Sequence, residues 1–176
     1  MQADSSSWIL GFDVGGTKTA VVAGTVNGRV LERASWPSNA AGGFESMWAA
    51  MVSSAEQLIL TRGRPVAIGA SIGGPLDTER GIVHSPTNLP GWDAYPLKDR
   101  LAAHFSVPAY VETDARAGAL AEWMFGAATG AHDLIYMPFG TGLGDGLILA
   151  DRRSRGPTYA AREAGQWRLS RPGPTA

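Results

Sequence analysis

The 176-residue sequence contains no cysteine and only three histidines. Without cysteine the chain forms neither a disulfide framework nor a thiolate metal site, and three scattered histidines do not make a zinc cluster. The formal net charge is -1, so no long-range field attracts nucleic acid or an anionic membrane. These absences exclude zinc from the expected cofactors and nucleic acid from the expected partners. They favour a small molecule as the partner.

Long apolar runs are also missing. No run approaches the roughly 20 residues that a membrane helix needs. The leader MQADSSS is polar and lacks the basic start and apolar centre of a secretory signal. We therefore expect a cytoplasmic protein with no membrane partner. With 44% hydrophobic residues, the chain can still bury a substantial core.

Short apolar runs open the chain. Residues 8–14, 19–26 and 29–36 have strand character and follow one another across glycine-containing turns, which predicts a three-stranded meander. Asn27 and Gly28 predict a type I′ turn between the second and third strands. Apolar residues then recur at helical spacing from Phe44 to Ile59, and Gly63 suits the position after the end of that helix.

The rest of the chain alternates strands and helices. Strands are expected at 65–72, 107–113, 133–139 and 146–151, a loop or short hairpin at 73–82, and helices at 96–105 and 114–128. This order predicts an α/β fold in which helices pack on a mixed sheet. From about Arg152 the sequence is charged and aperiodic. That stretch is either a poorly ordered tail or a segment separated from its packing partners, and we favour the second interpretation.

The stretch GFDVGGTKTA, residues 11–20, resembles a phosphate loop but follows neither common pattern. Thr17 intervenes before Lys18, so the P-loop spacing fails, and the stretch continues into a strand where a P-loop would open a helix. The Rossmann fingerprint is absent too. What remains is a strand ending in Asp13 and a tight Gly15-Gly16 turn. Such a turn can bind an anion through N–H groups, with Asp13 orienting hydrated magnesium, or it can be a plain hairpin.

A second segment has the same order of a strand, a Gly-Thr turn and another strand. Its turn contains Gly140, Thr141 and Gly142. Four segments, GFDVGGTKTA, SPTNLPGW, ETDARAGALAEW and FGTGLGDGLIL, together resemble the ROK family of bacterial sugar kinases and repressors, over residues 8 to 169. The resemblance implies a two-domain, ATP-dependent hexose kinase of ribonuclease-H-like, actin-like ATPase topology that forms homodimers. Residues 1–113 would be the N-terminal domain, and 114–176 the beginning of a second domain that is incomplete relative to the family.

Asp114 is the expected catalytic base. It stands where a strand passes into a helix, and a helix N-terminus favours the ionised carboxylate that a base requires. From the residues alone an N-cap role is an alternative; the resemblance implies the catalytic one. The resemblance also implies contacts with ATP and Mg2+, the latter held by Asp13 through water, and with sugar. The nucleotide residues would be Asp13, Gly15, Gly16, Thr17, Lys18, Gly140, Thr141 and Gly142, and the sugar residues Gly74, Asn88, Thr113, Glu163 and Gln166.

Several residues depart from the family pattern. Gln166 replaces a histidine, Thr113 and Arg116 replace asparagines, and Asp145 stands where glycine or alanine is usual. A carboxylate at Asp145 would repel a triphosphate, or it points into solvent. Glucose is the first expectation for the substrate, while fructose, mannose, allose and amino sugars stay open.

A noncatalytic sugar-binding module, such as a truncated pseudokinase or a regulatory relative, is the alternative to a kinase. Only seven residues precede Trp8, which leaves no room for a helix-turn-helix, so we do not expect a repressor. ROK kinases continue well beyond the length of this chain. We therefore expect apolar surface on the strands of the second domain to be exposed or covered by another copy.

Overall fold

The computed structural model describes residues 7–140 and 143–153. The chain divides into two compact units, Met1–Asp114 and Ala115–Ala176. The first unit contains, in chain order, β1 (Trp8–Val14), β2 (Lys18–Thr25), β3 (Val30–Pro37), the short 3-10 helix η1 (Ala40–Gly42), α1 (Gly43–Arg62), β4 (Ala67–Ile72), β5 (Leu76–Asp77), β6 (Ile82–Val83), β7 (Tyr95–Pro96), α2 (Leu97–Phe105) and β8 (Ala109–Thr113).

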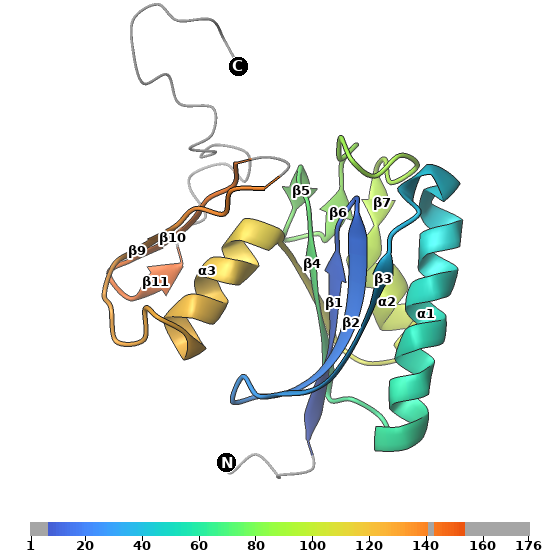
Figure 1. Cartoon of the computed structure of the whole chain (residues 1–176), viewed down its shortest axis with the longest axis horizontal. Helices are drawn as coiled ribbons and strands as arrows, with labels where there is room; N and C mark the ends of the chain where they lie inside the picture. Colours follow the sequence, from blue (N-terminus) through green and yellow to red (C-terminus); the bar gives the residue numbers. More distant parts are fainter. Residues whose placement is uncertain (1–6, 141–142, 154–176) are drawn as a thin grey trace, which may run out of the picture. The chain divides into compact units, whose positions relative to one another are not determined.

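The first unit is built on a five-stranded sheet with the order β3-β2-β1-β4-β8 (Figure 1). The first three strands form the expected antiparallel meander, whereas β4 runs parallel to β1 and β8 parallel to β4. In the register, Val14 lies opposite Ile72, and Ile72 lies opposite Thr113. The carboxyl ends of β1, β4 and β8 therefore meet at one edge of the sheet, which is where the segments with predicted functions begin.

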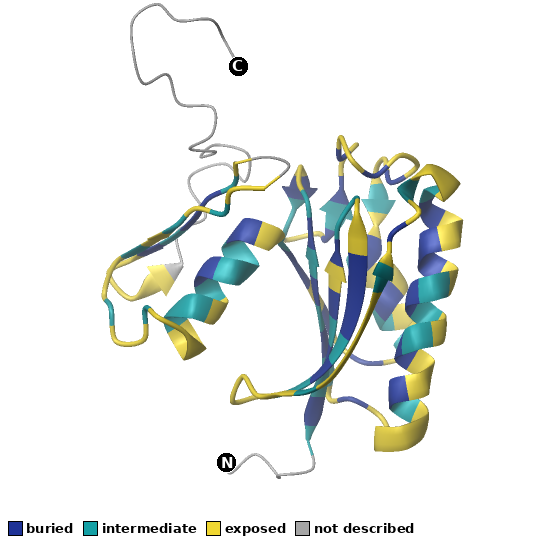
Figure 2. Ribbon diagram, in the orientation of Figure 1, coloured by how far each residue is buried: buried dark blue, intermediate teal, exposed yellow. Residues whose placement is uncertain are grey.

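The core lies on the side of this sheet that α1 and α2 cover (Figures 1 and 2). Alternate residues of β1, namely Leu10, Phe12 and Val14, are all buried there, as the period of two along a strand requires. The inner face of α1 has the expected helical spacing. It contributes Phe44, Met47, Trp48, Met51, Ala55 and Leu58.

The predicted type I′ turn between β2 and β3 is wrong. Gly28 N–H donates to the Thr25 carbonyl at 3.0 Å, and Thr25 N–H donates to the Arg29 carbonyl at 2.9 Å. Gly28 has a φ of 80°, whereas Asn27 is not among the residues with positive φ. The connection is thus a three-residue loop in which a turn is followed by one left-handed glycine. This geometry needs positive φ only at the glycine, whereas type I′ would impose it on Asn27 as well.

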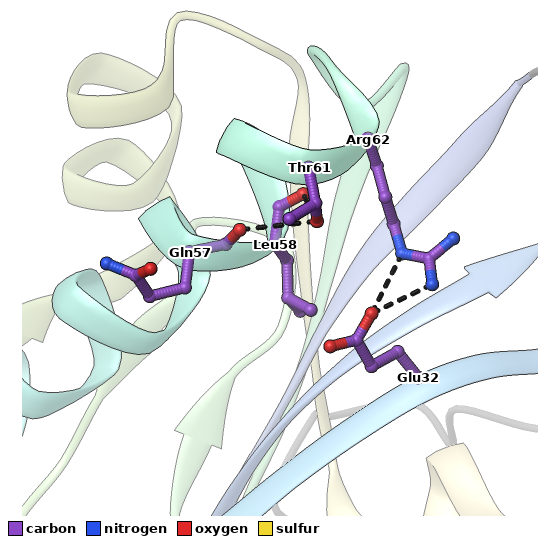
Figure 3. Close-up of polar contacts among 5 residues, drawn as sticks. All are labelled: Glu32, Gln57, Leu58, Thr61 and Arg62. Atoms are coloured by element: carbon purple, nitrogen blue, oxygen red, sulfur yellow. Dashed lines mark hydrogen bonds and ion pairs between the residues drawn. The ribbon is translucent and has the colours of Figure 1, made fainter.

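The end of α1 follows the prediction. The helix stops at Arg62, and Gly63, with a φ of 76°, donates its N–H to the Ile59 carbonyl at 2.9 Å. In the last turn, the Thr61 hydroxyl donates to the Leu58 carbonyl at 3.1 Å, and Arg62 Nη2 lies 2.8 Å from Glu32 Oε2 on β3 (Figure 3). Because this ion pair is partly exposed, it contributes less than about 1 kcal/mol. Its main effect is to align the helix end with the sheet.

The second unit contains most of α3 (Asp114–Phe125), followed by β9 (Leu134–Tyr136), β10 (Gly146–Leu149) and β11 (Arg152–Arg153) in an antiparallel sheet of order β11-β10-β9. The helix ends three residues earlier than predicted, because Gly126 is a poor helix residue and the Glu122 carboxylate accepts the Ala127 N–H at 2.9 Å. Apolar side chains on the strands are exposed, as expected: Ile135 on β9 is 64% exposed and Leu149 on β10 is 42% exposed.

Two smaller features complete the fold. The segment 73–82 contains the expected short hairpin, in which β5 pairs with β6, and β7 adds a third strand to this small sheet. No helix within the described residues combines the length and apolar character that crossing a membrane demands.

Candidate active site

The first glycine loop is a tight turn between β1 and β2, closed by a hydrogen bond from Gly15 N–H to the Lys18 carbonyl at 3.1 Å. It opens into a strand, as predicted. Its glycines are required by close contacts. A Cβ on Gly15 would lie 2.9 Å from the Lys18 carbonyl oxygen, and one on Gly16 would lie 2.6 Å from both the Cβ and the carbonyl oxygen of Asn88. Any larger residue at Gly16 would therefore displace the Asn88 backbone.

Asp13 lies near the end of β1 with its carboxylate exposed. Its Oδ1 accepts a hydrogen bond from Ser71 on β4 at 3.0 Å, and its Oδ2 lies 3.9 Å from Arg33 Nη2 on β3. Within residues 7–140 and 143–153, no group of three or more carboxylates or histidines could hold a metal ion. One exposed carboxylate still suits magnesium that keeps its water and is held mainly by phosphates. The Asp13 carboxylate thus fits a magnesium ion that it contacts through water, and not an ion that is surrounded by protein ligands.

Asn88 is exposed at the tip of a loop that is anchored on both sides. On one side its backbone contacts Gly16. On the other side Leu89 is 2% exposed and Trp92 is fully buried, with its ring centroid 4.8 Å from that of Phe44. The amide of Asn88 is therefore presented from a rigid support, next to the first glycine loop.

Gly74, Thr113 and Asp114 follow the neighbouring strand ends. A Cβ on Gly74 would lie 3.8 Å from Thr113 Cγ2, so the loop after β4 runs beside the end of β8. Asp114 is the first residue of α3 and is exposed. The buried Glu112 accepts the Thr113 N–H at 3.1 Å and the Thr78 hydroxyl at 3.2 Å through one oxygen, Oε1. These two bonds hold the backbone that immediately precedes Asp114.

The first unit therefore packs Gly16 against Asn88 and places Gly74 beside Thr113, and it aligns the strand ends that carry Asp13 and Asp114. Gly15, Thr17 and Lys18 belong to the same loop as Gly16. The other predicted residues belong to the second unit. Gly140 is exposed in the second unit, beside an antiparallel bridge between Phe139 and Leu143. The others, Thr141, Gly142, Glu163 and Gln166, lie outside the described residues.

Asp145 does not point into solvent, contrary to one of the two expectations for it. The residue is only 9% exposed and directly precedes β10. The neighbouring Gly146 and Gly144 lie against α3: a Cβ on Gly146 would be 2.5 Å from Ala119 Cβ, and one on Gly144 would be 2.8 Å from Ala115 Cβ. The glycines after the second loop thus serve helix packing.

A pocket of about 440 Å³ in the second unit contains none of the predicted site residues. Its lining includes Trp123, Met124, His132 and Asp151. A hydrogen bond of 2.8 Å between His132 Nδ1 and the Asp151 carboxylate raises the pKa of His132, and the charge of that carboxylate adds to the effect. Both groups are largely exposed, so this pair is a surface contact between the residues that precede β9 and those that follow β10.

Two residues of the candidate site were not predicted from the sequence. Ser38 is buried and hydrogen-bonds to the first glycine loop, and Ser71 bonds to Asp13. Serine at a strand end is common, so nothing at these positions distinguished them. The alternation of side chains along a strand could have identified Ser71. Once β1 and β4 are paired in register, Ser71 lies opposite Asp13 and on the same face of the sheet.

Gly16→Ala is expected to destabilise the first unit by about 1–3 kcal/mol, because the added methyl group overlaps Asn88 backbone atoms. Urea denaturation followed by circular dichroism measures this loss. Gly69→Ala is the matched control, since a Cβ there meets only open space among the described residues. Equal stability of the two variants would contradict the close contact between the loop and Asn88.

The chain is similar in sequence and in fold to known proteins. The family model described as ROK family matches residues 9–175. The chain is 32% identical over 160 residues to the glucokinase of Streptomyces coelicolor, covering 91% of this chain and 49% of that protein. It is also 32% identical over 109 residues to the xylose repressor of Bacillus subtilis, covering 62% of this chain and 28% of that protein.

Among solved structures, a ROK family glucokinase from Streptomyces griseus in complex with glucose and AMPPNP superposes with a TM-score of 0.83 at 31% identity. The match covers 93% of this chain and 51% of that protein. The chain thus spans about half the length of the relatives it matches. The ribonuclease-H-like, actin-like ATPase fold expected from the sequence is confirmed. With the matched residues extending over nearly the whole sequence, the chain belongs to the ROK family.

Proposed function

We propose that the protein is a sugar kinase that transfers the terminal phosphoryl group of ATP to a hydroxyl of a hexose, with glucose as the first substrate to test. The observation that carries this proposal is the exposed Asp114 carboxylate at the carboxyl end of β8. It stands at the same sheet edge as the glycine loop after β1 and the Asn88 loop that contacts it.

Phosphoryl transfer to an alcohol needs a base on the reacting hydroxyl, because the oxygen must lose its proton as the new bond to phosphorus forms. In the proposal Asp114 accepts that proton. Asp114 is the first residue of the 12-residue helix α3 and directly follows the carboxyl end of β8. The hydrogen bonds of Glu112 to Thr113 and Thr78 keep the strand end, and hence the base, in position.

The sugar is proposed to bind through Asn88, Gly74 and Thr113, with Glu163 and Gln166 as further contacts. Asn88 supplies both a donor and an acceptor to a hydroxyl, and its anchored loop lowers the entropy that binding costs. Gly74 is exposed and has no side chain, so a sugar can approach its backbone directly.

The nucleotide is proposed to bind through the first glycine loop, Gly15 to Lys18, and through Gly140, Thr141 and Gly142. Magnesium held through water by Asp13 would neutralise charge on the phosphates. The backbone N–H groups of the tight loop supply donors at fixed positions for phosphate oxygens. Lys18, exposed at the start of β2, adds a positive charge beside them.

A coupled assay of ADP release against a panel of hexoses and amino sugars tests the proposal. We expect ADP release with one sugar or a small group of sugars, well above the sugar-free rate. If no sugar of the panel causes ADP release, and the intact mass of the chain is confirmed, the kinase proposal is contradicted. If no sugar causes ADP release but calorimetry shows sugar binding, the result would support a noncatalytic sugar-binding module. This module is the second candidate because the chain is similar to a xylose repressor.

A further inference from the structure

Ser38 lies just after β3 and contacts the first glycine loop through both its backbone and its side chain. Its N–H donates to the Thr17 carbonyl at 3.0 Å, and its hydroxyl donates to the Gly15 carbonyl. The same hydroxyl lies 2.8 Å from Thr19 Oγ1. Ser38 and Thr19 are 3% and 1% exposed, so both hydroxyls are shielded from water. Ser38 thus holds two carbonyls of the loop, that of Gly15 through its buried hydroxyl and that of Thr17 through its backbone N–H.

These bonds determine where the N–H groups of the loop point. In a planar trans peptide the C=O and the following N–H point in opposite directions. Since Ser38 draws the Gly15 carbonyl toward itself, the Gly16 N–H points away from Ser38. The bond to the Thr17 carbonyl directs the Lys18 N–H away in the same manner. Within residues 7–140 and 143–153, no hydrogen bond engages the Gly16 N–H, so this donor is available to a ligand.

We infer that Ser38, oriented by Thr19, is a positioning residue that presents the backbone N–H group of Gly16 to the phosphate oxygens of the nucleotide. The inference rests on the proposed function for the identity of the ligand. Donors that are oriented before the ligand arrives bind an anion more tightly, because no reorganisation is needed on binding. Without the Ser38 hydroxyl, the peptide group between Gly15 and Gly16 can rotate. The Gly16 N–H is then no longer held in one direction.

The experiment compares the full chain with Ser38→Ala, with Thr19→Val and with the control Ser35→Ala. Ser35 is an exposed residue of β3 and has no part in these hydrogen bonds. Calorimetry measures the affinity for magnesium AMPPNP and for magnesium tripolyphosphate. Amide hydrogen exchange measures the protection of the Gly15 N–H, which bonds to Lys18.

We expect Ser38→Ala to weaken both affinities by about tenfold, the effect of losing one oriented hydrogen bond. Thr19→Val, which keeps the shape of threonine without its hydroxyl, should give a smaller loss in the same direction. Exchange at Gly15 should accelerate, while exchange in the core of α1 stays slow. Ser35→Ala should leave all of these quantities unchanged.

Several outcomes would overturn the inference. Unchanged affinities in both Ser38→Ala and Thr19→Val exclude the positioning role. Faster exchange throughout the first unit would mean that Ser38 only stabilises the fold. If the unsubstituted chain binds neither phosphate probe, the proposed function fails and with it the role toward phosphate. The exchange measurement then still decides whether Ser38 holds the loop.

Discussion

Asp114→Asn is expected to lower the rate of phosphoryl transfer by about 10²–10⁴-fold, the usual contribution of a general base. Asparagine keeps the shape and the hydrogen-bonding reach of the side chain but cannot accept the proton of the sugar hydroxyl. Sugar affinity should change little, because the proposed binding residues stay in place. The measurement is kcat in the ADP-release assay together with the sugar affinity from calorimetry, using the sugar that gives activity.

Asp99→Asn is the matched control for that variant. Asp99 also lies in the first turn of a helix, α2, so its loss removes the same favourable interaction with a helix N-terminus. We expect full activity in the control. Equal losses in both variants would assign the effect at Asp114 to helix stability, and undiminished turnover in Asp114→Asn would remove this carboxylate from the mechanism.

Trp92→Ala is expected to destabilise the protein by about 3–5 kcal/mol, since it empties the space of a fully buried indole. The ring lies edge-on to Phe44 at 4.8 Å between centroids and 6.0 Å from Tyr95, so no neighbour can fill the gap without moving the start of α1. Because the loop that ends in Trp92 carries Asn88, sugar affinity should fall as well. Denaturant unfolding followed by far-ultraviolet circular dichroism measures the first effect, and calorimetry the second.

Trp92→Phe separates ring volume from hydrogen bonding at this position. Among the described residues the Trp92 Nε1 has no hydrogen-bond partner, so phenylalanine removes no bond and keeps most of the packing. We expect a loss of about 1–3 kcal/mol, smaller than that of Trp92→Ala, because phenylalanine keeps one aromatic ring and leaves only a small cavity. A loss as large as that of Trp92→Ala would indicate that the indole nitrogen is engaged, contrary to the structure.

The strands and helices of the first unit were predictable because their signals are local. Alternation along β1, from Leu10 to Val14, is set by the period of the strand itself. The position of Gly63 after α1 follows from the conformational freedom of glycine. The turn after β2 was mispredicted because the same Asn27-Gly28 pair fits two hairpin geometries. Only the pairing of Thr25 with Arg29 selects between them.

The sequence by itself determined the family, the order of the strands and helices, and the residue types available for chemistry, including the Asp114 carboxylate between a strand and a helix. Only the tertiary structure decided that Gly16 is required by the Asn88 backbone, that Ser38 holds the glycine loop and that Glu112 holds the residue before the base. The reason is physical. Periodicity and turn propensity act between neighbours along the chain, whereas these contacts depend on the register and packing of strands and loops that are far apart in it.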